Sequence, residues 1–558
     1  MALRAPSARA LLPAVIGGLC FLLLKTDARS AAPVEEAPAP RMAAADVDQA
    51  LISEIKARSE IMKNLQYLSD QIGGRLTGSA SLERANKWTA EKMKEYGLEN
   101  VRLEPWEIPY GWQRGKAEMK IVEPNNGRTL MIASYGWAPG TKGKVTGDVV
   151  ILKGRNKADL QAYKGKLKNA IVMVSPPANV KPITDTSYGP GTPRKEPSKD
   201  APKKDEPKKD EPKKDEPKKD EPKKDEPKKD ELKKEEPKKD SASTTEDIGA
   251  GSWIRDEQQP GFGFAGEMRA FAKEEGAACE ITDSAKPHGL LVTTGGWRGD
   301  RAAAESGMAR VFMAHEHYAL LYRLASREKE TTRVEVEIEN KFIPGPIVVY
   351  NTIGEVRGSE KPDEIVVVGA HLDSWELGSG TTDNGTGSCV VLETARTVAK
   401  LAKDGQPPKR TIRFCLFTGE EQGLYGSKKY VEKHKEDMPK HSVALVHDTG
   451  TGKVLGFGTQ GRKNIIPILE PQLESLKAID GWKGLDIAGM GGTDHLPFES
   501  AGVPGFACKQ DMDEYRFTHH TQSDTFDKAK EPNLLQGAQV MAVTAVRVAN
   551  LPELLPRK

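Results

Sequence analysis

Beyond Val348, short continuous apolar runs alternate with segments of helical pattern. The run EIVVVGA at 364–370 shows no polar alternation, which is typical of a strand covered on both faces. A helical pattern follows at 388–402, and the alternation then repeats. The later strand-like runs are 411–419, 442–448 and 502–509, and the later helical segments are 427–436, 465–476 and 533–551. This order predicts an α/β sheet, in which sites lie beyond the carboxyl ends of the strands.

The first half of the chain has a different pattern. Residues 47–105 predict two helices, at 48–71 and 81–97, joined by a glycine-rich turn. Residues 117–175 and 277–345 contain short strand-like runs that predict one β-rich module. The runs lie at 147–154, 169–175, 289–296 and 332–340. Since the chain has 558 residues, which is more than one core usually supports, we expect two or more domains.

A charged repeat interrupts the β-rich module. From Glu196 to Asp240 the sequence repeats in fives, mostly as EPKKD. Proline in every unit excludes a helix, and the dense charges resist burial. The sequence therefore predicts a disordered, solvated spacer at 185–250. It is either a tolerated insertion or a tether to a cell surface or cell wall.

The first 30 residues predict an export signal. Arg4 and Arg9 precede the apolar stretch 11–24, and small residues follow it. The stretch is short for a membrane span, which needs about 20 apolar residues. We therefore expect export to a periplasm or to the medium and no stable membrane span. An uncleaved anchor is the alternative.

The charge balance and the cysteines restrict the function further. The chain has 83 Lys and Arg against 81 Asp and Glu, a formal net charge of +2, which argues against a nucleic-acid surface. Besides Cys20 in the predicted signal, four cysteines show no CxxC spacing, and three of them lie in apolar segments. We predict no disulfide framework.

Ionisable side chains follow each predicted strand of the α/β sheet. His371, the pair Glu420 and Glu421, Asp448 and the segment HHTQSDT at 519–525 all come after such strands. Each has an ordinary explanation when taken alone, as a turn residue or a helix-start residue. Together they bring acids to one edge of a sheet without a nearby counter-charge, a cost that bound cations remove.

The donor types indicate which cation this is. Imidazole and carboxylate groups in one site favour zinc over calcium or magnesium. Two histidines and three carboxylates, with one acid left over as a base, are too many for one tetrahedral ion. They fit two ions that share a carboxylate, as in two-metal hydrolytic sites. We therefore expect two zinc ions per chain.

Several motifs carry a resemblance to a known family. They are HLDSW at 371–375, TDNGTG at 382–387, FTGEEQGLYGS at 417–427, HDTG at 447–450, GGTDHLPFESAGVP at 491–504 and HHTQSDT. These resemble the dizinc aminopeptidase and glutamate carboxypeptidase family, most closely its plasma glutamate carboxypeptidase (carboxypeptidase Q-like) branch. IGGRLTGS, ERANKW and GWQRG, within 72–115, also look similar to that branch. The resemblance implies a mixed, mostly parallel sheet flanked by helices, with an inserted β-rich protease-associated domain.

The resemblance also implies roles for single residues. One zinc ion would be held by His371, Asp383 and Asp448. The other would be held by Asp383, Glu421 and His520, so that Asp383 bridges the two ions.

Two further acids would take part in the chemistry. Glu420 would act as the general base for a hydroxide shared by the ions, and Asp373 would orient the imidazole of His371. His519 and His520 compete for one ligand role, because adjacent residues of an extended stretch face opposite sides. The motif register of the family selects His520.

Three more residues lie in matching segments without a settled role. Asp494, His495 and Tyr515 shape the pocket or polarise the substrate, or else serve the structure alone. The resemblance also implies a cis peptide bond between Asp383 and Asn384.

The predicted organisation is a signal peptide at 1–30, a peptidase domain from 45–115 and 346–556, and an inserted protease-associated domain at 116–345. The predicted function is that of an exported dizinc exopeptidase that acts on peptide substrates. It is either an aminopeptidase or a dipeptidase or carboxypeptidase, and a homodimer is possible. One alternative is a non-catalytic binding protein on the same fold. The other is a glutaminyl cyclase-like acyltransferase, which typically uses one zinc ion.

Overall fold

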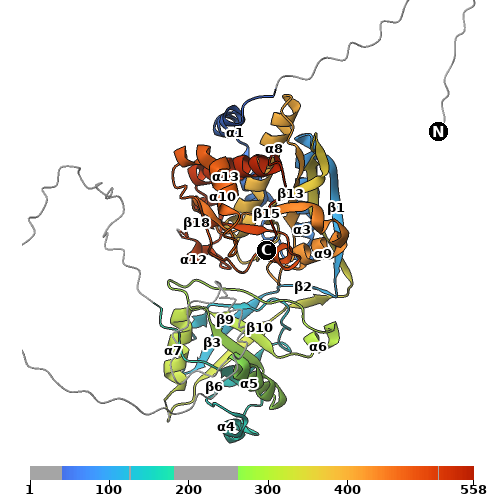
Figure 1. Cartoon of the computed structure of the whole chain (residues 1–558). Coiled ribbons are helices and arrows are strands. Elements are labelled where there is room, and N and C mark those ends of the chain that lie inside the picture. Colours follow the sequence, from blue (N-terminus) through green and yellow to red (C-terminus); the bar gives the residue numbers. More distant parts are fainter. Residues whose placement is uncertain (1–40, 125–126, 181–261, 328, 513, 558) are drawn as a thin grey trace, which may run out of the picture. The chain divides into compact units, whose positions relative to one another are not determined.

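The computed structural model describes residues 41–124, 127–180, 262–327, 329–512 and 514–557. The predicted export signal and the charged repeat lie outside these ranges. The helices and strands below all belong to one compact unit, Met42–Lys558 (Figure 1). Among the described residues, we find no helix with the length and apolar character needed to cross a membrane.

The first sheet has eight strands in the order β1-β12-β14-β13-β15-β18-β16-β17. They are β1 (Glu99–Ile108), β12 (Ile347–Val356), β13 (Lys361–His371), β14 (Arg410–Phe417), β15 (His441–Val446), β16 (Val454–Gly458), β17 (Leu485–Asp486) and β18 (Gly505–Gln510). The four central strands β14, β13, β15 and β18 are parallel, whereas β12 is antiparallel to β14 and β16 is antiparallel to β18. The predicted mixed, mostly parallel α/β sheet is confirmed.

The helices of this part of the chain flank the first sheet. They are α1 (Ala44–Arg58), α2 (Ile61–Gln66), η1 (Tyr67–Ile72), α3 (Ala80–Glu95), η3 (Thr381–Gly385), α8 (Thr386–Lys403), α9 (Tyr425–Lys433), η4 (Lys435–Lys440), α10 (Ile466–Leu469), η5 (Glu470–Ala478), α11 (His495–Ser500), α12 (Tyr515–Thr518), η6 (Phe526–Lys528) and α13 (Glu531–Ala549).

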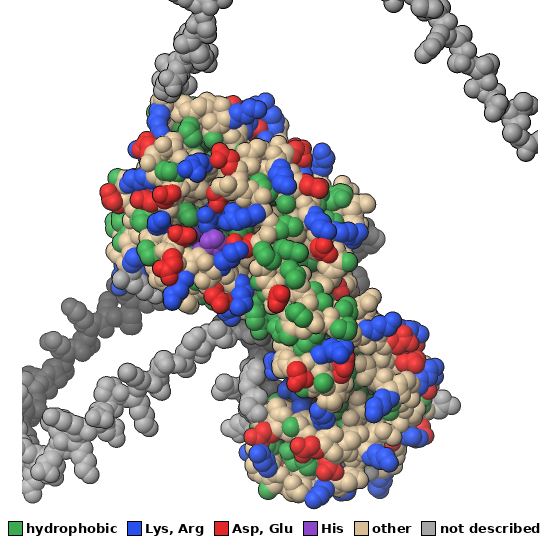
Figure 2. Space-filling view, turned by 90° about the vertical axis from the view of Figure 1, so that its right-hand side faces the viewer, with side chains coloured by type: hydrophobic (Ala, Val, Ile, Leu, Met, Phe, Trp, Pro, Cys, Tyr) green, Lys and Arg blue, Asp and Glu red, His purple; other side chains and the backbone are tan. Residues whose placement is uncertain are grey.

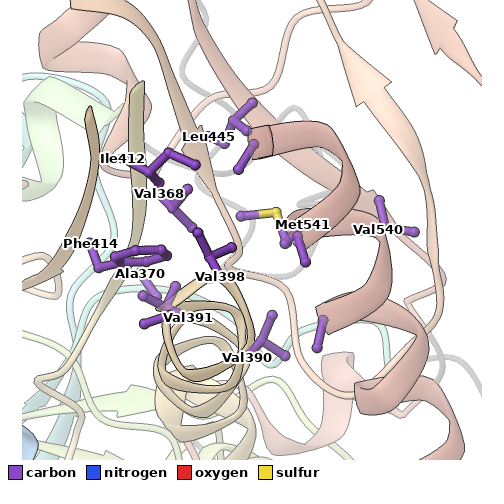
Figure 3. Packing of buried hydrophobic residues seen from close by; sticks show 14 of the residues in the cluster. Val368, Ala370, Val390, Val391, Val398, Ile412, Phe414, Leu445, Val540 and Met541 are labelled. Atoms are coloured by element: carbon purple, nitrogen blue, oxygen red, sulfur yellow. The ribbon is translucent and has the colours of Figure 1, made fainter. Parts of the chain in front are cut away.

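Alternate residues of β13 pack on the two faces of this sheet. Val366, Val368 and Ala370 belong to one buried cluster with residues of α8 and α13 (Figure 3). Ile365 and Val367 belong to a second cluster with residues of α9 and α11. Both faces are therefore covered, which explains why this strand has a continuous apolar sequence.

Two predicted helices are interrupted in the structure. The single helix predicted at 48–71 is wrong, because Ser59 leaves the helical conformation and its hydroxyl accepts the N–H of Ile61. The chain continues as α2 and then as η1, which is a π-helix. The helix predicted at 465–476 is α-helical only over α10 and is a 3₁₀ helix from Glu470 onwards. Pro471 near its start has no N–H to continue the α-helical ladder.

The second sheet has the order β4-β3-β10-β6-β7-β8-β9-β5. Its strands are β3 (Ala117–Glu123), β4 (Thr129–Leu130), β5 (Ile132–Ser134), β6 (Val145–Ile151), β7 (Ile171–Met173), β8 (Cys279–Asp283), β9 (Ala309–Met313) and β10 (Arg333–Ile338). Its helices are α4 (Lys157–Leu160), η2 (Gln161–Tyr163), α5 (Phe262–Glu274), α6 (Arg301–Glu305) and α7 (His315–Ala325), and β2 (Gly111–Gln113) pairs with β11 (Lys341–Ile343). All strands of this second sheet lie within 116–345. That it is a separate, inserted protease-associated domain stays a prediction.

The strand predicted at 289–296 is wrong. Only isolated bridges form there, between Val292 and Thr521 and between Gly295 and Gly136. Gly289 and Gly295 have φ angles of +71° and +148°, which break an extended strand. The run lies against the loop that contains Thr521, instead of joining the hydrogen-bonded ladder of a sheet.

One prediction from composition agrees with the described residues. Cys279, Cys389, Cys415 and Cys508 are free and buried, so no disulfide links them. Figure 2 shows Lys and Arg side chains interspersed with Asp and Glu over the face in view. This mixing fits a chain with little net charge.

Candidate active site

The pairing register brings the ends of three strands together. β13 and β14 are parallel with His371 opposite Phe417, and Val446 of β15 lies opposite the residue two positions before His371. Glu420 and Asp448, which follow these strands, therefore leave the same edge of the sheet. The prediction that polar residues gather at this edge is confirmed for these strands.

The first group of possible metal ligands is His371, Asp383 and Asp448. The Nε2 atom of His371 lies 3.1 Å from Oδ1 of Asp448 and 3.3 Å from Oδ1 of Asp383. All three side chains are buried, and their ligand atoms lie close enough together to hold one ion.

The second group of possible ligands contains Asp383, Glu421 and His520. The Nε2 atom of His520 lies 2.9 Å from Oε2 of Glu421 and 3.5 Å from Oδ2 of Asp383. The two oxygens of Asp383 thus face two different histidines. Asp383 Oδ2 and Glu421 Oε1 are buried and have no hydrogen-bond partner among the described residues. Unpaired carboxylate oxygens of this kind fit a bound cation.

The two adjacent histidines do not face opposite sides, so that part of the prediction is wrong. Their rings stack with centroids 3.8 Å apart, and Nε2 of His519 lies 3.8 Å from Oδ2 of Asp383. The cause is the backbone of His520, whose φ of +59° puts it in the left-handed region. Both rings therefore reach the second ligand group, and Nε2 of His520 also lies 2.9 Å from Oε2 of Glu421.

Asp373 links the two predicted acid segments. Its carboxylate accepts the backbone N–H groups of Glu420 and Glu421, each at 3.3 Å, and the hydroxyl of Thr77 at 3.0 Å. The Nδ1–H of His371 donates to the backbone carbonyl of Asp373 at 3.0 Å, and the carboxylate is 3.6 Å away. Asp373 therefore contacts both His371 and the backbone of the two glutamates.

Burial shifts the pKa values of the clustered groups. It raises the pKa of Glu420 well above its usual value, and the carboxylates of Asp448 and Asp494 raise it further. Burial alone would lower the pKa of His371, but Asp448 and Glu420 raise it well above its usual value. Burial and Asp383 likewise raise the pKa of Glu421. Because metal ligands must release their protons, metal binding at these groups would depend on pH.

Asp494 and Tyr515 lie near this cluster, and His495 contacts the backbone. Burial and the nearby carboxylate of Asp448 raise the pKa of Asp494 to about 7, and one oxygen of Asp494 accepts the hydroxyl of Ser427. Tyr515 is buried, and the charges of acids in both ligand groups raise its pKa. His495 contacts the carbonyl of Met490 at 3.0 Å, which indicates a structural role.

Two loops of the site depend on residues whose roles the sequence did not predict. Arg75 is buried and donates to the carbonyls of Leu372, at 2.6 Å, and Gly380, at 2.7 Å. Asp524 accepts the backbone N–H groups of Thr382 and Asp383. Both lie inside motifs quoted above, as a charged residue among small ones. The implied cis peptide bond between Asp383 and the next residue is confirmed.

Comparison with known proteins gives a family match for part of the chain. Residues 351–545, which carry the proposed ligands, match the profile of Peptidase family M28. This part of the chain is therefore similar to that family, and the chain is a zinc-dependent metallopeptidase.

Relatives named Carboxypeptidase Q match most of the chain. It is 25% identical to Carboxypeptidase Q of Xenopus laevis over 507 residues, which cover 90% of this chain and 88% of that protein. It is 27% identical to Carboxypeptidase Q of Rattus norvegicus over 519 residues, which cover 92% of this chain and 90% of the relative.

Solved structures agree on the fold. A Peptidase M28 precursor from Shewanella amazonensis has a TM-score of 0.66 at 24% identity, covering 92% of this chain and 99% of its own. BSAP, a zinc aminopeptidase from Bacillus subtilis, has a TM-score of 0.54 at 18% identity, covering 87% of this chain and 93% of its own.

Proposed function

We propose that the chain is a dizinc exopeptidase. His371, Asp383 and Asp448 would hold one zinc ion, and Asp383, Glu421 and His520 would hold the other. The observation that carries the proposal is the placement of Asp383, whose two oxygens lie 3.3 Å and 3.5 Å from the rings of His371 and His520. Two-metal hydrolytic sites place a shared ligand between their ions in this way.

The chain's own residues supply the proton transfers. Zinc, when bound, supplies a Lewis acid that lowers the pKa of water and polarises the scissile carbonyl. Glu420 accepts a proton from the attacking water and then donates it to the departing amine. A raised pKa suits Glu420 to both steps, since it must accept and release one proton. Asp373 positions Glu420 by accepting its backbone N–H.

The names of similar proteins support an exopeptidase. Two relatives that cover 90% and 92% of the chain are called Carboxypeptidase Q, and a protein of similar fold is called a zinc aminopeptidase. We propose peptide substrates cleaved next to a free end. We also propose that the chain is exported, on the basis of its first 30 residues.

A panel assay tests this function. The purified full chain is incubated with dipeptides, C-terminally extended peptides and aminoacyl anilides, with and without a zinc chelator. We expect turnover that the chelator abolishes and that added zinc restores. Stoichiometric zinc without turnover on any substrate would instead support a binding protein. Cyclisation of amino-terminal glutamine with one zinc ion per chain would support the acyltransferase alternative.

A further inference from the structure

Residues Lys286–Thr293 follow β8 of the second sheet and lie outside the part of the chain that matches the peptidase family. We call them the 286–293 segment. Ser284 lies two residues before the segment, and its hydroxyl accepts the N–H of Val292 at 3.2 Å. Glu316 of α7 accepts the N–H groups of His288 and Gly289, at 2.7 Å and 3.1 Å. The segment is thus held firmly on the second sheet's part of the chain.

Lys286 contacts the backbone next to the histidine pair. Its Nζ donates to the carbonyl of Arg516 at 2.6 Å and to the carbonyl of His519 at 3.0 Å. α12 ends at Thr518, so the carbonyls around its end lack intrahelical partners. A lysine ammonium is well suited to these carbonyls because it carries three donors and a positive charge.

The other end of the segment contacts His520 itself. The N–H of Thr293 donates to the carbonyl of His520 at 3.0 Å, and Val292 forms an antiparallel bridge with Thr521. The side chain of Gln522 joins the same two parts. Its oxygen accepts the N–H of Leu291 at 2.8 Å, and its nitrogen donates to the carbonyl of Gly289 at 3.1 Å.

These contacts surround a backbone that needs support. His520 has a left-handed φ of +59°, which a residue other than glycine adopts only where its surroundings enforce it. The 286–293 segment contacts the carbonyl of His519, directly before His520, and the carbonyl of His520 itself. The first ligand group is different, because His371 ends β13 and Asp448 follows β15 inside the first sheet.

We propose that the 286–293 segment, with Lys286 at its start, is the positioning element that holds His520 for the second zinc ion. The inference rests on the proposed dizinc function and adds that the second ion depends on a part of the chain outside the matched peptidase region. The ion held by His371 and Asp448 does not depend on it. Loss of the segment's contacts should therefore weaken one zinc ion selectively.

The test measures zinc binding by the full chain at buffered free zinc concentrations. We compare Lys286→Met with Lys286→Arg, which keeps the charge and the donors. The matched control is Lys361→Met, because Lys361 also donates to a backbone carbonyl, that of Pro552, at 2.6 Å. Cobalt replaces zinc in a parallel series, so that the absorption spectrum reports the ligands of each site separately from activity.

We expect Lys286→Met to bind one ion as the parent chain does and the other at least about tenfold more weakly. Lys286→Arg should recover most of this loss, and Lys361→Met should bind both ions normally. The spectrum of only one cobalt ion should change. Equal binding of both ions by folded Lys286→Met, or equal weakening of both, would overturn the proposal.

A second variant covers the case in which Lys286→Met does not fold. Gln522→Ala removes two contacts with the segment and leaves Lys286 in place, and we expect it to weaken the second ion about threefold. Unchanged affinity in this variant would overturn the proposal as well. If the parent chain itself fails to bind two zinc ions, the proposed function has failed. If the parent chain binds two ions and the variants bind both as the parent does, only the proposal about the 286–293 segment has failed.

Discussion

The two halves of the proposed metal centre are built in different ways. His371 is the last residue of β13, and Asp448 follows β15 by two residues, so the sheet places both. Glu421 and His520 lie on loops, and the loop of His520 is held by contacts from the second sheet's part of the chain. Asp383 lies between the halves and contacts both histidines.

This difference shows that ligands at strand ends and ligands on loops need different structural support. Strand ends are fixed by a hydrogen-bonded ladder and a packed core, so they position ligands without further support. A loop ligand needs contacts of its own, which here come from residues more than 200 positions away in the sequence. We therefore expect the strand half to be the more robust one. The predictions below test this comparison, beginning with the largest effect.

Substitution of the shared ligand should remove the distinction between the halves. In Asp383→Asn, both ions lose a charged ligand, so we expect both to bind weakly and turnover to fall on the order of 10⁴-fold or more. Zinc per chain after dialysis and kcat/KM measure this. The exposed Asp404→Asn is the matched control. Retention of one tightly bound ion by Asp383→Asn would show that Asp383 does not bridge.

Substitution of the proposed base should leave both halves intact. Glu420→Gln removes the proton acceptor but no proposed ligand. We expect kcat to fall by about 10²–10⁴-fold with two zinc ions still bound. Glu432→Gln, at an exposed glutamate, serves as control. Unchanged turnover in Glu420→Gln would contradict the assigned role.

The two stacked histidines can be separated by matched substitutions. His520→Ala removes a proposed ligand of the loop half. We expect the affinity for one zinc ion to fall about 100-fold or more, since even residues that only support a ligand change affinity by about 10–100-fold. His519→Ala should lose less than about tenfold. A larger loss in His519→Ala than in His520→Ala would exchange their roles.

The sheet that carries the strand half should have a stability that depends on pH, because of His441 at the start of β15. His441 is buried, and burial lowers its pKa to about 4. The unfolded chain therefore takes up a proton first as the pH falls below the usual value of about 6.5, so stability is lost towards acid.

From pH 7 to pH 5 this loss amounts to about 2 kcal/mol. Denaturant unfolding of the parent chain and of His441→Gln at both pH values measures it. We expect the variant to lose about that much less stability between the two pH values. Identical losses in the two proteins would contradict a neutral, buried His441.

The sequence was sufficient to predict the strand half. Parallel strands bring their carboxyl ends to one edge, so residues such as His371 and Asp448 could be grouped from the order of apolar runs alone. The central strands, their covering helices and the absence of disulfides among the described cysteines followed from pattern and composition in the same way.

The loop half could not be predicted to the same extent. The stacking of His519 on His520 depends on a left-handed φ angle at His520, and no residue type in HHTQSDT predicts that angle. The run at 289–296 has the composition of a strand, but its partner is a distant loop, and its glycines prevent a ladder. The roles of Arg75 and Lys286 depend on which carbonyls the fold brings to them.

The most direct test of the central claim is a crystal structure of the zinc-loaded chain with anomalous scattering measured at the zinc edge. We predict two peaks about 3.5–4 Å apart, with the Asp383 carboxylate between them, His371 at one peak and His520 at the other. A single peak, or two peaks that do not share Asp383, would contradict the account.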